Sequence, residues 1–370
     1  MKILIAGDPA SSHTVKWANA ISSRGIEVFV FGLGSYDKKN YDSSIKIDTF
    51  SVLTDKIKMK GDGNYTKLLY LASIPRLKEI LREFKPDILH SFYATSYGLI
   101  STLTRFRPHL ISVWGSDVMA FPQRSIAHKK ILFYILKKAD GVFATSNYLS
   151  SLVYSMFTIQ CGVVPFGIDI NLFSPAPKAF DKPENCITIG IVKSLEKIYR
   201  IDLLLKTFNL LVARHPDFQL KLVIAGSGTR MNELKKEAVD LGIDNKTIFK
   251  GYISNRFISR EIQGFDIAVF PSERESFGVS LLEVMACGIP SVVSRIRSYE
   301  EILAKSGAAI CVNESTPEAF AKEISFLINN KKIRLEMGIK ARNHVVVNYD
   351  FKNNVDTLIA NYTEMVRLKL

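Results

Sequence analysis

Short apolar runs alternate with amphipathic helical stretches along nearly the whole chain. The apolar runs predict strands at 3–6, 28–31, 88–89, 110–113, 187–192, 220–224, 248–250, 267–270 and 291–293. Helical periodicity predicts helices at 12–25, 202–215, 278–286 and 353–369. Strands and helices that alternate in this way are typical of parallel α/β folds. Residues 37–67 are polar and irregular, and the pattern leaves their organisation open.

A proline-rich segment divides this pattern into two series. Residues 165–183 contain four prolines, at 165, 175, 177 and 183, around the turn Gly167-Ile168-Asp169. Such a density of prolines breaks regular structure and suits an interdomain connection. A chain of 370 residues is also too long for one ordinary core. We therefore expect one domain at 1–170 and a second at 171–351.

Polar residues gather where the predicted strands end. They are Gly7-Asp8, His90, Trp114 to Asp117, Lys193, Gly226 to Gly228, and Ser272 to Glu275. Ligands of open α/β sheets bind outside the carboxyl ends of the strands. Two such sheets facing each other would place all these groups around one central cleft.

The segment 264–294 carries the most specific chemistry. Glu275 lies in a loop after the strand at 267–270, and Glu283 lies in the helix that follows. The peptide N–H groups of Phe277, Gly278 and Val279 stand at the start of that helix, where the macrodipole favours an anion. A carboxylate beside an anion site suits a nucleotide sugar, which joins hydroxyls to a diphosphate. Two carboxylates could also act as a hydrolytic acid/base pair, but Glu283 is poorly placed to reach the same bond.

This segment resembles glycosyltransferase family 4, the retaining enzymes of the GT-B fold. The family signature is Glu, seven residues, Glu, with Ser276-Phe277-Gly278 after the first Glu here and Met285-Ala-Cys-Gly-Ile-Pro290 after the second. The resemblance covers essentially the whole chain. It implies two Rossmann-like domains facing a central cleft, with the C-terminal helix at 352–370 packing back on the first domain. It also implies that Glu275 binds the donor sugar and Glu283 the nucleotide ribose.

Other segments of the second half extend the resemblance. Gly190 to Lys197 is similar to a Gly-Arg…Glu-Lys element whose two cations bind the diphosphate, which implies this role for Lys193 and Lys197. Lys193 replaces the usual Arg and gives up bidentate phosphate geometry, so Lys197 is the stronger candidate. Arg200 stands where the family usually has Gly. Gly226 and Gly228 are phosphate-loop candidates, although Gly-x-Gly also forms plain tight turns. Tyr252 and Ile253 resemble the segment that holds the base.

The first half binds the acceptor in this family. Asp8 and His13 follow the first strand. Trp114-Gly-Ser-Asp117 resembles a His-Gly-x-Asp element in which Trp replaces His. Asp117 is therefore a catalytic candidate on the acceptor side, and Trp114 either stacks on a sugar or base or belongs to the core. His90 either faces the acceptor or is a hydrogen-bonded structural histidine.

The chain is basic, with 49 Lys and Arg against 36 Asp and Glu and a formal net charge of +13. Up to Ser174 there are 21 basic and 13 acidic residues, which suggests an anionic partner for the first half. Nucleic acid is disfavoured, because no aromatic-and-basic platform or zinc spacing occurs. An anionic membrane surface or a phosphate-bearing acceptor fits better, and a merely solvated basic surface is the alternative. A predicted helix carries Arg76, Lys78, Arg82 and Lys85, and Arg105 and Arg107 follow.

The four cysteines lie far apart without metal-ligand spacing, as in a reduced cytosolic protein. The N-terminal apolar run is too short for a signal peptide, and no run approaches the roughly 20 apolar residues that span a bilayer. We expect a cytoplasmic protein, peripheral at the inner face of the plasma membrane.

The predicted function is retaining transfer of a sugar from a UDP- or GDP-sugar to a glycan or lipid-linked acceptor, in bacterial envelope polysaccharide synthesis. No cofactor or metal ion is expected, because Lys side chains and a helix end can stabilise the leaving diphosphate. A sugar-nucleotide epimerase of the same fold is an alternative. A dinucleotide-dependent oxidoreductase is another, although Gly-x-Gly-x-x-Gly does not follow the first strand. A non-catalytic binding subunit is the third.

Overall fold

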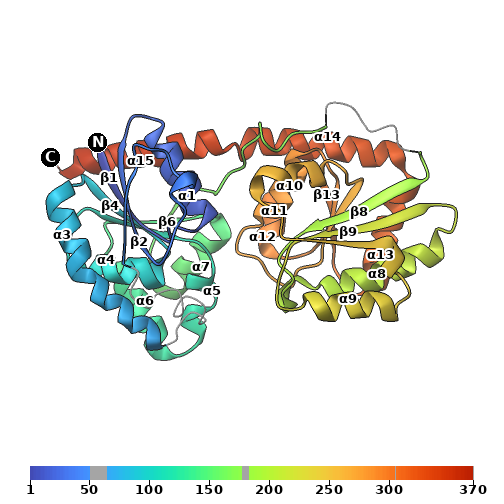
Figure 1. The fold of residues 1–370 in the computed structure, drawn as a ribbon, viewed down its shortest axis with the longest axis horizontal. Coiled ribbons are helices and arrows are strands. Elements are labelled where there is room, and N and C mark those ends of the chain that lie inside the picture. Colours follow the sequence, from blue (N-terminus) through green and yellow to red (C-terminus); the bar gives the residue numbers. More distant parts are fainter. Residues whose placement is uncertain (51–64, 177–182, 305, 370) are drawn as a thin grey trace. The chain divides into compact units, whose positions relative to one another are not determined.

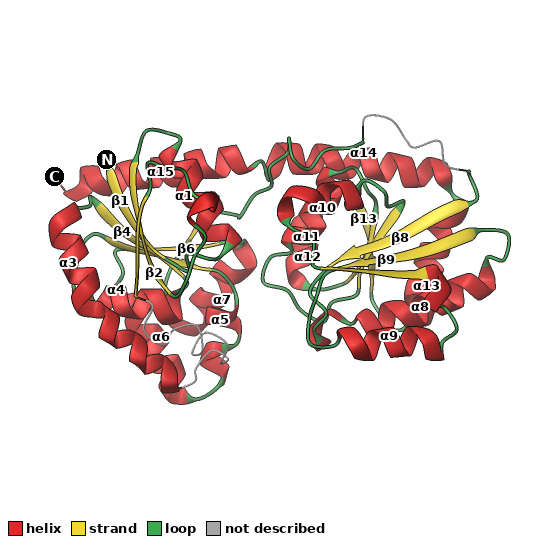
Figure 2. Ribbon diagram, in the orientation of Figure 1, coloured by secondary structure: helices red, strands yellow, loops and turns green. Residues whose placement is uncertain are grey.

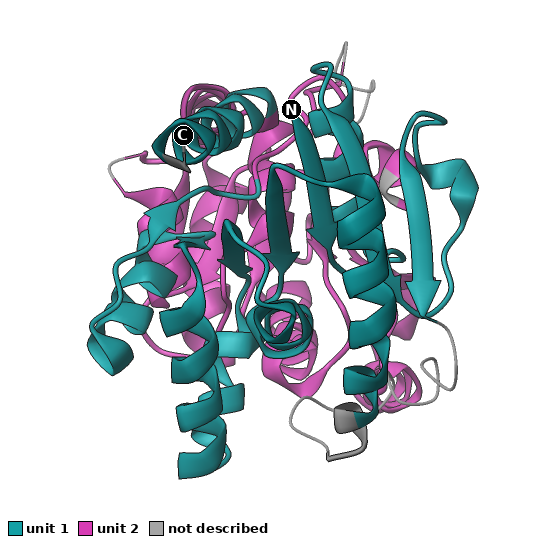
Figure 3. Ribbon diagram, turned by 90° about the vertical axis from the view of Figure 1, so that its left-hand side faces the viewer, with its two compact units in different colours: residues 1–166, 352–370 teal, residues 167–351 magenta. Residues whose placement is uncertain are grey.

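The computed structural model describes residues 1–50, 65–176, 183–304 and 306–369. The chain divides into two compact units, of which unit 1 comprises Met1–Phe166 and Lys352–Leu370 and unit 2 comprises Gly167–Phe351 (Figures 1 and 3). The division after Phe166 falls four residues before the end of the predicted first domain. Pro177 of the predicted connection lies outside the described residues.

Unit 1 is built on a parallel sheet with the strand order β3-β2-β1-β4-β5-β6-β7. The strands are β1 (Lys2–Ala6), β2 (Glu27–Leu33), β3 (Lys46–Phe50), β4 (Ile88–Phe92), β5 (His109–Val113), β6 (Gly141–Ala144) and β7 (Gly162–Val163). The α-helices are α1 (Ser12–Ser22), α3 (Ile74–Phe84), α4 (Leu99–Thr104), α5 (Ser116–Met119), α6 (Ile126–Lys138), α7 (Asn147–Phe157) and α15 (Phe351–Lys369). Helices cover both faces of the sheet (Figure 2), which explains why its central strands β4 and β5 are buried throughout.

Side-chain alternation in the strands separates the two faces of this sheet. Leu4 of β1 and Leu89 of β4 pack with Leu77 of α3 in one buried cluster. The next residue of β4, His90, points to the other face and contacts Tyr362 of α15. The C-terminal helix is thus part of the core of unit 1.

Unit 2 contains a second parallel sheet, with the order β10-β9-β8-β11-β12-β13. Its strands are β8 (Cys186–Val192), β9 (Gln219–Ala225), β10 (Thr247–Gly251), β11 (Ile267–Phe270), β12 (Ser291–Ser294) and β13 (Ala309–Val312). Its α-helices are α8 (Ile201–Arg214), α9 (Met231–Asp240), α10 (Asn255–Ile262), α11 (Val279–Ala286), α12 (Arg297–Leu303), α13 (Pro317–Asn329) and α14 (Lys331–Asn348). In Figure 2, α8, α9 and α13 lie on one side of the sheet and α11 and α14 on the other.

All nine predicted strands are present, most of them one to three residues longer than predicted. Within residues 37–67, which the sequence pattern left unassigned, β3 forms and pairs with β2 at the edge of the sheet. Residues 51–64 of that stretch lie outside the described residues.

In each sheet the strand order reverses at the first strand of the unit. β1 lies between β2 and β4, and β8 lies between β9 and β11. Ligands of open α/β sheets bind at such reversal points, outside the carboxyl ends of the strands. The polar residues that the sequence places at strand ends follow β1, β5, β8, β9 and β11, as expected, except that His90 lies inside β4. Among the described residues, no helix combines the length and the apolarity needed to cross a bilayer.

Candidate functional site

Two loops of unit 2 lie against each other at the carboxyl ends of β8 and β9. The backbone N–H of Lys193, directly after β8, donates to the carbonyl oxygen of Ala225 at 2.9 Å. Gly226 follows β9 with φ 146°, and a Cβ placed on it would lie 1.9 Å from the carbonyl oxygen of Lys193. A Cβ on Gly228 would lie 2.6 Å from the backbone of Leu195. Only glycine permits this close approach.

Lys193 forms an ion pair with Glu275 of the loop after β11. The two side chains are only 11% and 8% exposed, and a pair this buried is strongly interdependent, because removal of either partner leaves an uncompensated charge. The ammonium also lies 4.4 Å from the centre of the Tyr199 ring. Glu275 Oε1 accepts hydrogen bonds from the hydroxyls of Tyr299 at 3.3 Å and Ser272 at 3.4 Å. Burial raises the pKa of Tyr299 well above its ordinary value, so its hydroxyl stays a donor.

Glu196 holds the Lys193–Lys197 loop to the glycine loop. Its carboxylate accepts the backbone N–H of Thr229 at 2.9 Å and the Thr229 hydroxyl at 2.6 Å. These two hydrogen bonds lower the pKa of Glu196. The next residue, Lys197, begins a short 3-10 turn (Lys197–Tyr199) and is exposed to solvent. Its charge contributes to a lowered pKa at Glu233, after the larger effect of Arg230. Lys197 thus belongs to the loop that begins at Lys193, and its charge acts on Glu233 of α9.

Arg200 keeps the conformation expected of the glycine that it replaces. Its φ is 50°, in the left-handed region. The guanidinium binds Asp202 at 3.3 Å and Glu273 at 3.2 Å, and the N–H of Glu273 donates to the carbonyl oxygen of Ile198 at 2.9 Å. The loop after β8 is thereby fixed to the loop after β11.

Helix α11 begins beside this cluster. Gly278 precedes it with φ 107°, and a Cβ there would lie 2.9 Å from the Tyr299 ring. Phe277 is buried and meets the Tyr349 ring edge-on at 6.1 Å, whereas Ser276 is half-buried. The first N–H groups of a helix have no partner within the helix and favour an anion. Glu283 is half-buried one turn further along α11.

The loop after β10 borders the glycine loop, because the N–H of Gly226 donates to the carbonyl oxygen of Gly251 at 2.8 Å. The next residues are the base-binding candidates: Tyr252 is exposed and Ile253 is half-buried. An exposed tyrosine offers a ring face on which a base can stack.

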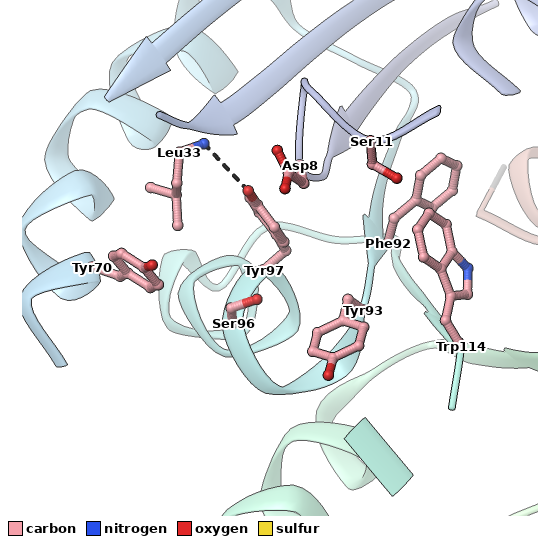
Figure 4. A pocket seen from close by; sticks show the side chains of 9 residues that line it. All are labelled: Asp8, Ser11, Leu33, Tyr70, Phe92, Tyr93, Ser96, Tyr97 and Trp114. Carbon is pink, nitrogen blue, oxygen red and sulfur yellow. Dashed lines mark hydrogen bonds between the residues drawn. The ribbon is translucent and has the colours of Figure 1, made fainter. Parts of the chain in front are cut away.

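Unit 1 has a pocket of about 280 Å³ at the carboxyl ends of its central strands (Figure 4). Asp8 and Ser11 come from the loop after β1, Leu33 ends β2, and Trp114 follows β5. The complete lining is Asp8, Ser11, Leu33, Tyr70, Phe92, Tyr93, Ser96, Tyr97 and Trp114. A largely aromatic wall with a few hydroxyls and one carboxylate suits a polar ligand with apolar faces, such as a sugar.

Three of these lining residues, the tyrosines, were not singled out from the sequence. Tyr97 is buried and accepts a hydrogen bond from the N–H of Leu33 at 3.3 Å. Tyr93 has φ 84°, rare for a bulky residue, and its hydroxyl is hydrogen-bonded to that of Ser116. Backbone strain of this kind concentrates at functional sites.

Trp114 belongs to an aromatic cluster at the edge of the pocket. Its ring lies 5.1 Å from Phe92 and 5.3 Å from Phe166, and His13 stacks on Phe166 at 4.2 Å. Burial, with a smaller contribution from Lys16, lowers the pKa of His13 to about 4, so this ring is neutral at pH 7. Trp114 thus lines the pocket and packs in a cluster at once.

The structure contradicts a catalytic role for Asp117. Its side chain is fully buried, and its carboxylate accepts the backbone N–H groups of Ala94 at 3.0 Å, Trp114 at 3.1 Å and Gly115 at 2.8 Å. These bonds fix the backbone that carries Trp114. Asp117 is a positioning residue.

The acceptor-side assignment of His90 is also wrong. The side chain is completely buried, with Nδ1 2.6 Å from the Tyr362 hydroxyl and Nε2 2.8 Å from the Ser112 hydroxyl. Burial, with a smaller effect of His109, lowers its pKa to about 3. His90 is the hydrogen-bonded structural histidine that the sequence left as the alternative.

Two family models match the chain and together include most of it. The model described as "Glycosyl transferase 4-like" matches residues 2–146, and the model described as "Glycosyl transferases group 1" matches residues 174–344. The chain belongs to glycosyltransferase family 4.

Relatives and solved structures agree with this membership. The glycosyltransferase is 27% identical over 305 residues to D-inositol 3-phosphate glycosyltransferase of Corynebacterium urealyticum, which covers 75% of this chain and 72% of the relative. Its fold matches sucrose-phosphate synthase from Thermosynechococcus elongatus with a TM-score of 0.83 at 16% identity, covering 100% of both chains. Anabaena HepE in complex with UDP-glucose matches with a TM-score of 0.77 at 14% identity, covering 98% of this chain and 100% of the other. The fold is GT-B.

In this glycosyltransferase the loops that hold most of the predicted donor-side residues are joined to one another in unit 2. Backbone hydrogen bonds, an ion pair and the Glu196 carboxylate join the loops that hold them. The connecting residues Glu196, Tyr199, Ser272 and Tyr299 were not given roles from the sequence. For Glu196 the signal was present, since it is the Glu of the Gly-Arg…Glu-Lys element.

Proposed function

We propose that this glycosyltransferase moves a sugar from a UDP- or GDP-sugar to a glycan or lipid-linked acceptor, with retention at the anomeric carbon. The observation that carries the proposal is the contact of Lys193 with Glu275 where the glycine loop meets the loop after β8. A cation beside a carboxylate matches the two ends of a nucleotide sugar, the diphosphate and the sugar hydroxyls.

The donor-side residues are assigned the roles that the family resemblance implies, and their chemistry suits these roles. Lys193, Lys197 and the amides of the Gly226 loop bind the diphosphate and stabilise the charge that develops as it leaves. Glu275 accepts hydrogen bonds from sugar hydroxyls, and Glu283 from the ribose. A diphosphate that reaches Lys193 competes with Glu275 for the same ammonium, which frees the carboxylate for the sugar.

The same cations support a further element of the proposal, namely that the reaction needs no divalent metal ion. Two lysines and a helix N-terminus supply positive potential where the leaving group's charge appears.

The acceptor is proposed to bind unit 1 in the pocket lined by Asp8, Tyr93, Tyr97 and Trp114. The net charge of the first half favours an anionic acceptor or one held at an anionic membrane surface, as in synthesis of a bacterial envelope polysaccharide.

A thermal-shift series tests the donor. A specific donor at 100 times its Kd stabilises the fold by about 2.7 kcal/mol, so one UDP- or GDP-sugar should raise the melting temperature while NAD and ATP do not. UDP-glucose is the first donor to test. If only NAD raises the melting temperature, the protein is an oxidoreductase, and if a UDP-sugar is epimerised without an acceptor, it is an epimerase. The anomeric configuration of the product, read by NMR, tests retention.

A further inference from the structure

Helix α6 presents an unusual surface to solvent. Leu132, Ile135 and Leu136 point into the core of unit 1, but four large apolar side chains of the same helix are exposed: Ile126, Ile131, Phe133 and Tyr134. Ile126 is 76% exposed. We call the exposed residues Ile126, Lys129, Lys130, Ile131, Phe133, Tyr134, Lys137 and Lys138 the α6 surface.

Apolar and basic side chains share one stripe of this surface. Ile126, Lys130, Phe133 and Lys137 are spaced i, i+4, i+7 and i+11, which places them in line on one side of a helix. Phe133 stacks on Phe157 of α7 with ring centroids 5.8 Å apart, and the ammonium of Lys137 lies 5.5 Å from the centre of the Phe133 ring. The exposed aromatic ring is thus held in place between a packed neighbour and a lysine.

The α6 surface carries uncompensated positive charge along the sequence. Residues 118–139 contain no Asp or Glu but contain Arg124, Lys129, Lys130, Lys137 and Lys138. Helix α3, where the sequence suggested a basic face, differs. Arg76 is paired there with Asp48 and Glu79, and Glu83 adds a further negative charge.

Helix stability accounts for Lys137 and Lys138, which lie in the last turn of α6 where the macrodipole favours positive charge, but not for Lys129 and Lys130. Lys129 and Lys130 lie near the start of α6, whose first turn contains no acidic residue. Positive charge near a helix N-terminus is unfavourable because it opposes the macrodipole. Residues that break a local rule without local compensation are expected at functional surfaces.

We propose that the α6 surface docks onto an anionic lipid bilayer. Lysines are depleted from the interfaces between proteins, whereas helices that lie on membranes combine Lys with Phe, Tyr and aliphatic side chains. A lysine stem can lie along the apolar side chains while its ammonium reaches the lipid phosphates, and tyrosine favours the headgroup level. The biological role of this docking rests on the proposed function, because docking would hold the enzyme at the bilayer where a lipid-linked acceptor is found.

Vesicle co-sedimentation tests the proposal with the full chain and without donor or turnover, so its failure is separate from failure of the proposed function. We expect binding to vesicles of phosphatidylcholine mixed with phosphatidylglycerol, weakened by salt and absent with phosphatidylcholine alone. Each lysine near an anionic surface contributes about fivefold in affinity, so Lys129→Gln/Lys130→Gln should reduce binding about 25-fold. Ile126→Ser should reduce it roughly tenfold, because the inserted aliphatic side chain is lost.

The matched control is Lys78→Gln/Arg82→Gln on α3, which removes the same charge from unit 1 and should leave vesicle binding within a few-fold of the wild type. All substituted side chains are exposed, so thermal unfolding should be unchanged. Equal loss in the control variant would overturn the proposal, because net charge alone would then explain binding. Absence of binding to anionic vesicles, or binding that neither α6 variant reduces, would also overturn it. Self-association of the protein that is lost in Lys129→Gln/Lys130→Gln but kept in Ile126→Ser would overturn the proposal as well. Binding to heparin with the same dependence on these variants would also overturn it.

Discussion

Replacing Gly226 with alanine should separate catalysis from stability. The new Cβ would lie 1.9 Å from the carbonyl oxygen of Lys193, whereas real Cβ atoms keep at least 3.0 Å from their neighbours. The two loops must therefore move apart by about 1 Å, and a displacement of that size at a reacting centre costs on the order of 10²-fold in rate. This corresponds to about 2.7 kcal/mol of transition-state stabilisation. The fold should survive, because the strain of about 1–3 kcal/mol is small against the stability of an ordinary domain.

The control for this substitution is Gly242→Ala. Gly242 also has a positive φ, +67°, but a Cβ there meets nothing within 4 Å. It should cost about 1 kcal/mol of stability and leave kcat/KM unchanged. The assay is kcat/KM with the donor selected by thermal shift, beside the free energy of unfolding in urea. A folded Gly226→Ala enzyme with kcat/KM within a few-fold of the wild type would refute the role of the close approach in placing Lys193.

Four other results are expected. Lys197→Ala should lower kcat/KM by about 10²-fold, as for loss of one preorganised charge-stabilising group, and near-normal turnover would remove Lys197 from the mechanism. Glu196→Ala should weaken donor binding by roughly tenfold, because the hydrogen bonds that hold its loop to the glycine loop are lost and a hydrogen bond to a charged group is worth about 1.5–3 kcal/mol. Thr229→Val removes the hydroxyl partner of the same carboxylate, so its loss of donor affinity, measured by titration calorimetry, should not add to that of Glu196→Ala. Activity should persist in EDTA, and loss that magnesium or manganese restores would contradict the metal-free proposal. Finally, burial lowers the pKa of His90 and of His109 to about 3, so below pH about 6.5 the unfolded chain binds more protons than the folded one. The free energy of unfolding should be independent of these groups above that pH and should fall by about 1.4 kcal/mol per pH unit for each of them below it. Urea titrations at several pH values would show no such decline if the rings were solvated.

The sequence predicted the central strands because residues buried on both faces form continuous apolar runs. Strands β3, β6, β7 and β13 escaped prediction. Strand β3 lies at the sheet edge, where Lys46 and Asp48 interrupt the apolar pattern. Most of the predicted donor-side residues lie in short loops directly after strands, where sequence order alone fixes their position at one edge of the sheet.

The misassigned residues depend on partners that sequence order does not place. The apolar run that predicts β4 ends before His90, but the strand continues through this residue, and its partner Tyr362 is 272 positions away. Asp117 keeps its place in the motif, and only the fold shows that backbone N–H groups occupy its carboxylate. Tyr299 meets Glu275 from helix α12, 24 positions away in the sequence. The positive φ of Tyr93 could not be predicted, because in a sequence only glycine commonly indicates such a conformation.

The return of α15 to unit 1 determines the order in which the protein can complete its structure during synthesis. Val355, Leu358 and Tyr362 of this helix are buried, and Arg24 binds Asp356 at 2.7 Å. A nascent chain ending at residue 166 lacks these contacts, and the Nδ1 of His90 lacks its hydroxyl partner. Domains commonly fold in order as the ribosome releases them. Here unit 1 lacks α15 until residues 352–369 have emerged, whereas all strands of unit 2 have emerged once residue 351 has been released. A ribosome-bound intermediate should therefore resist protease in unit 2 before unit 1.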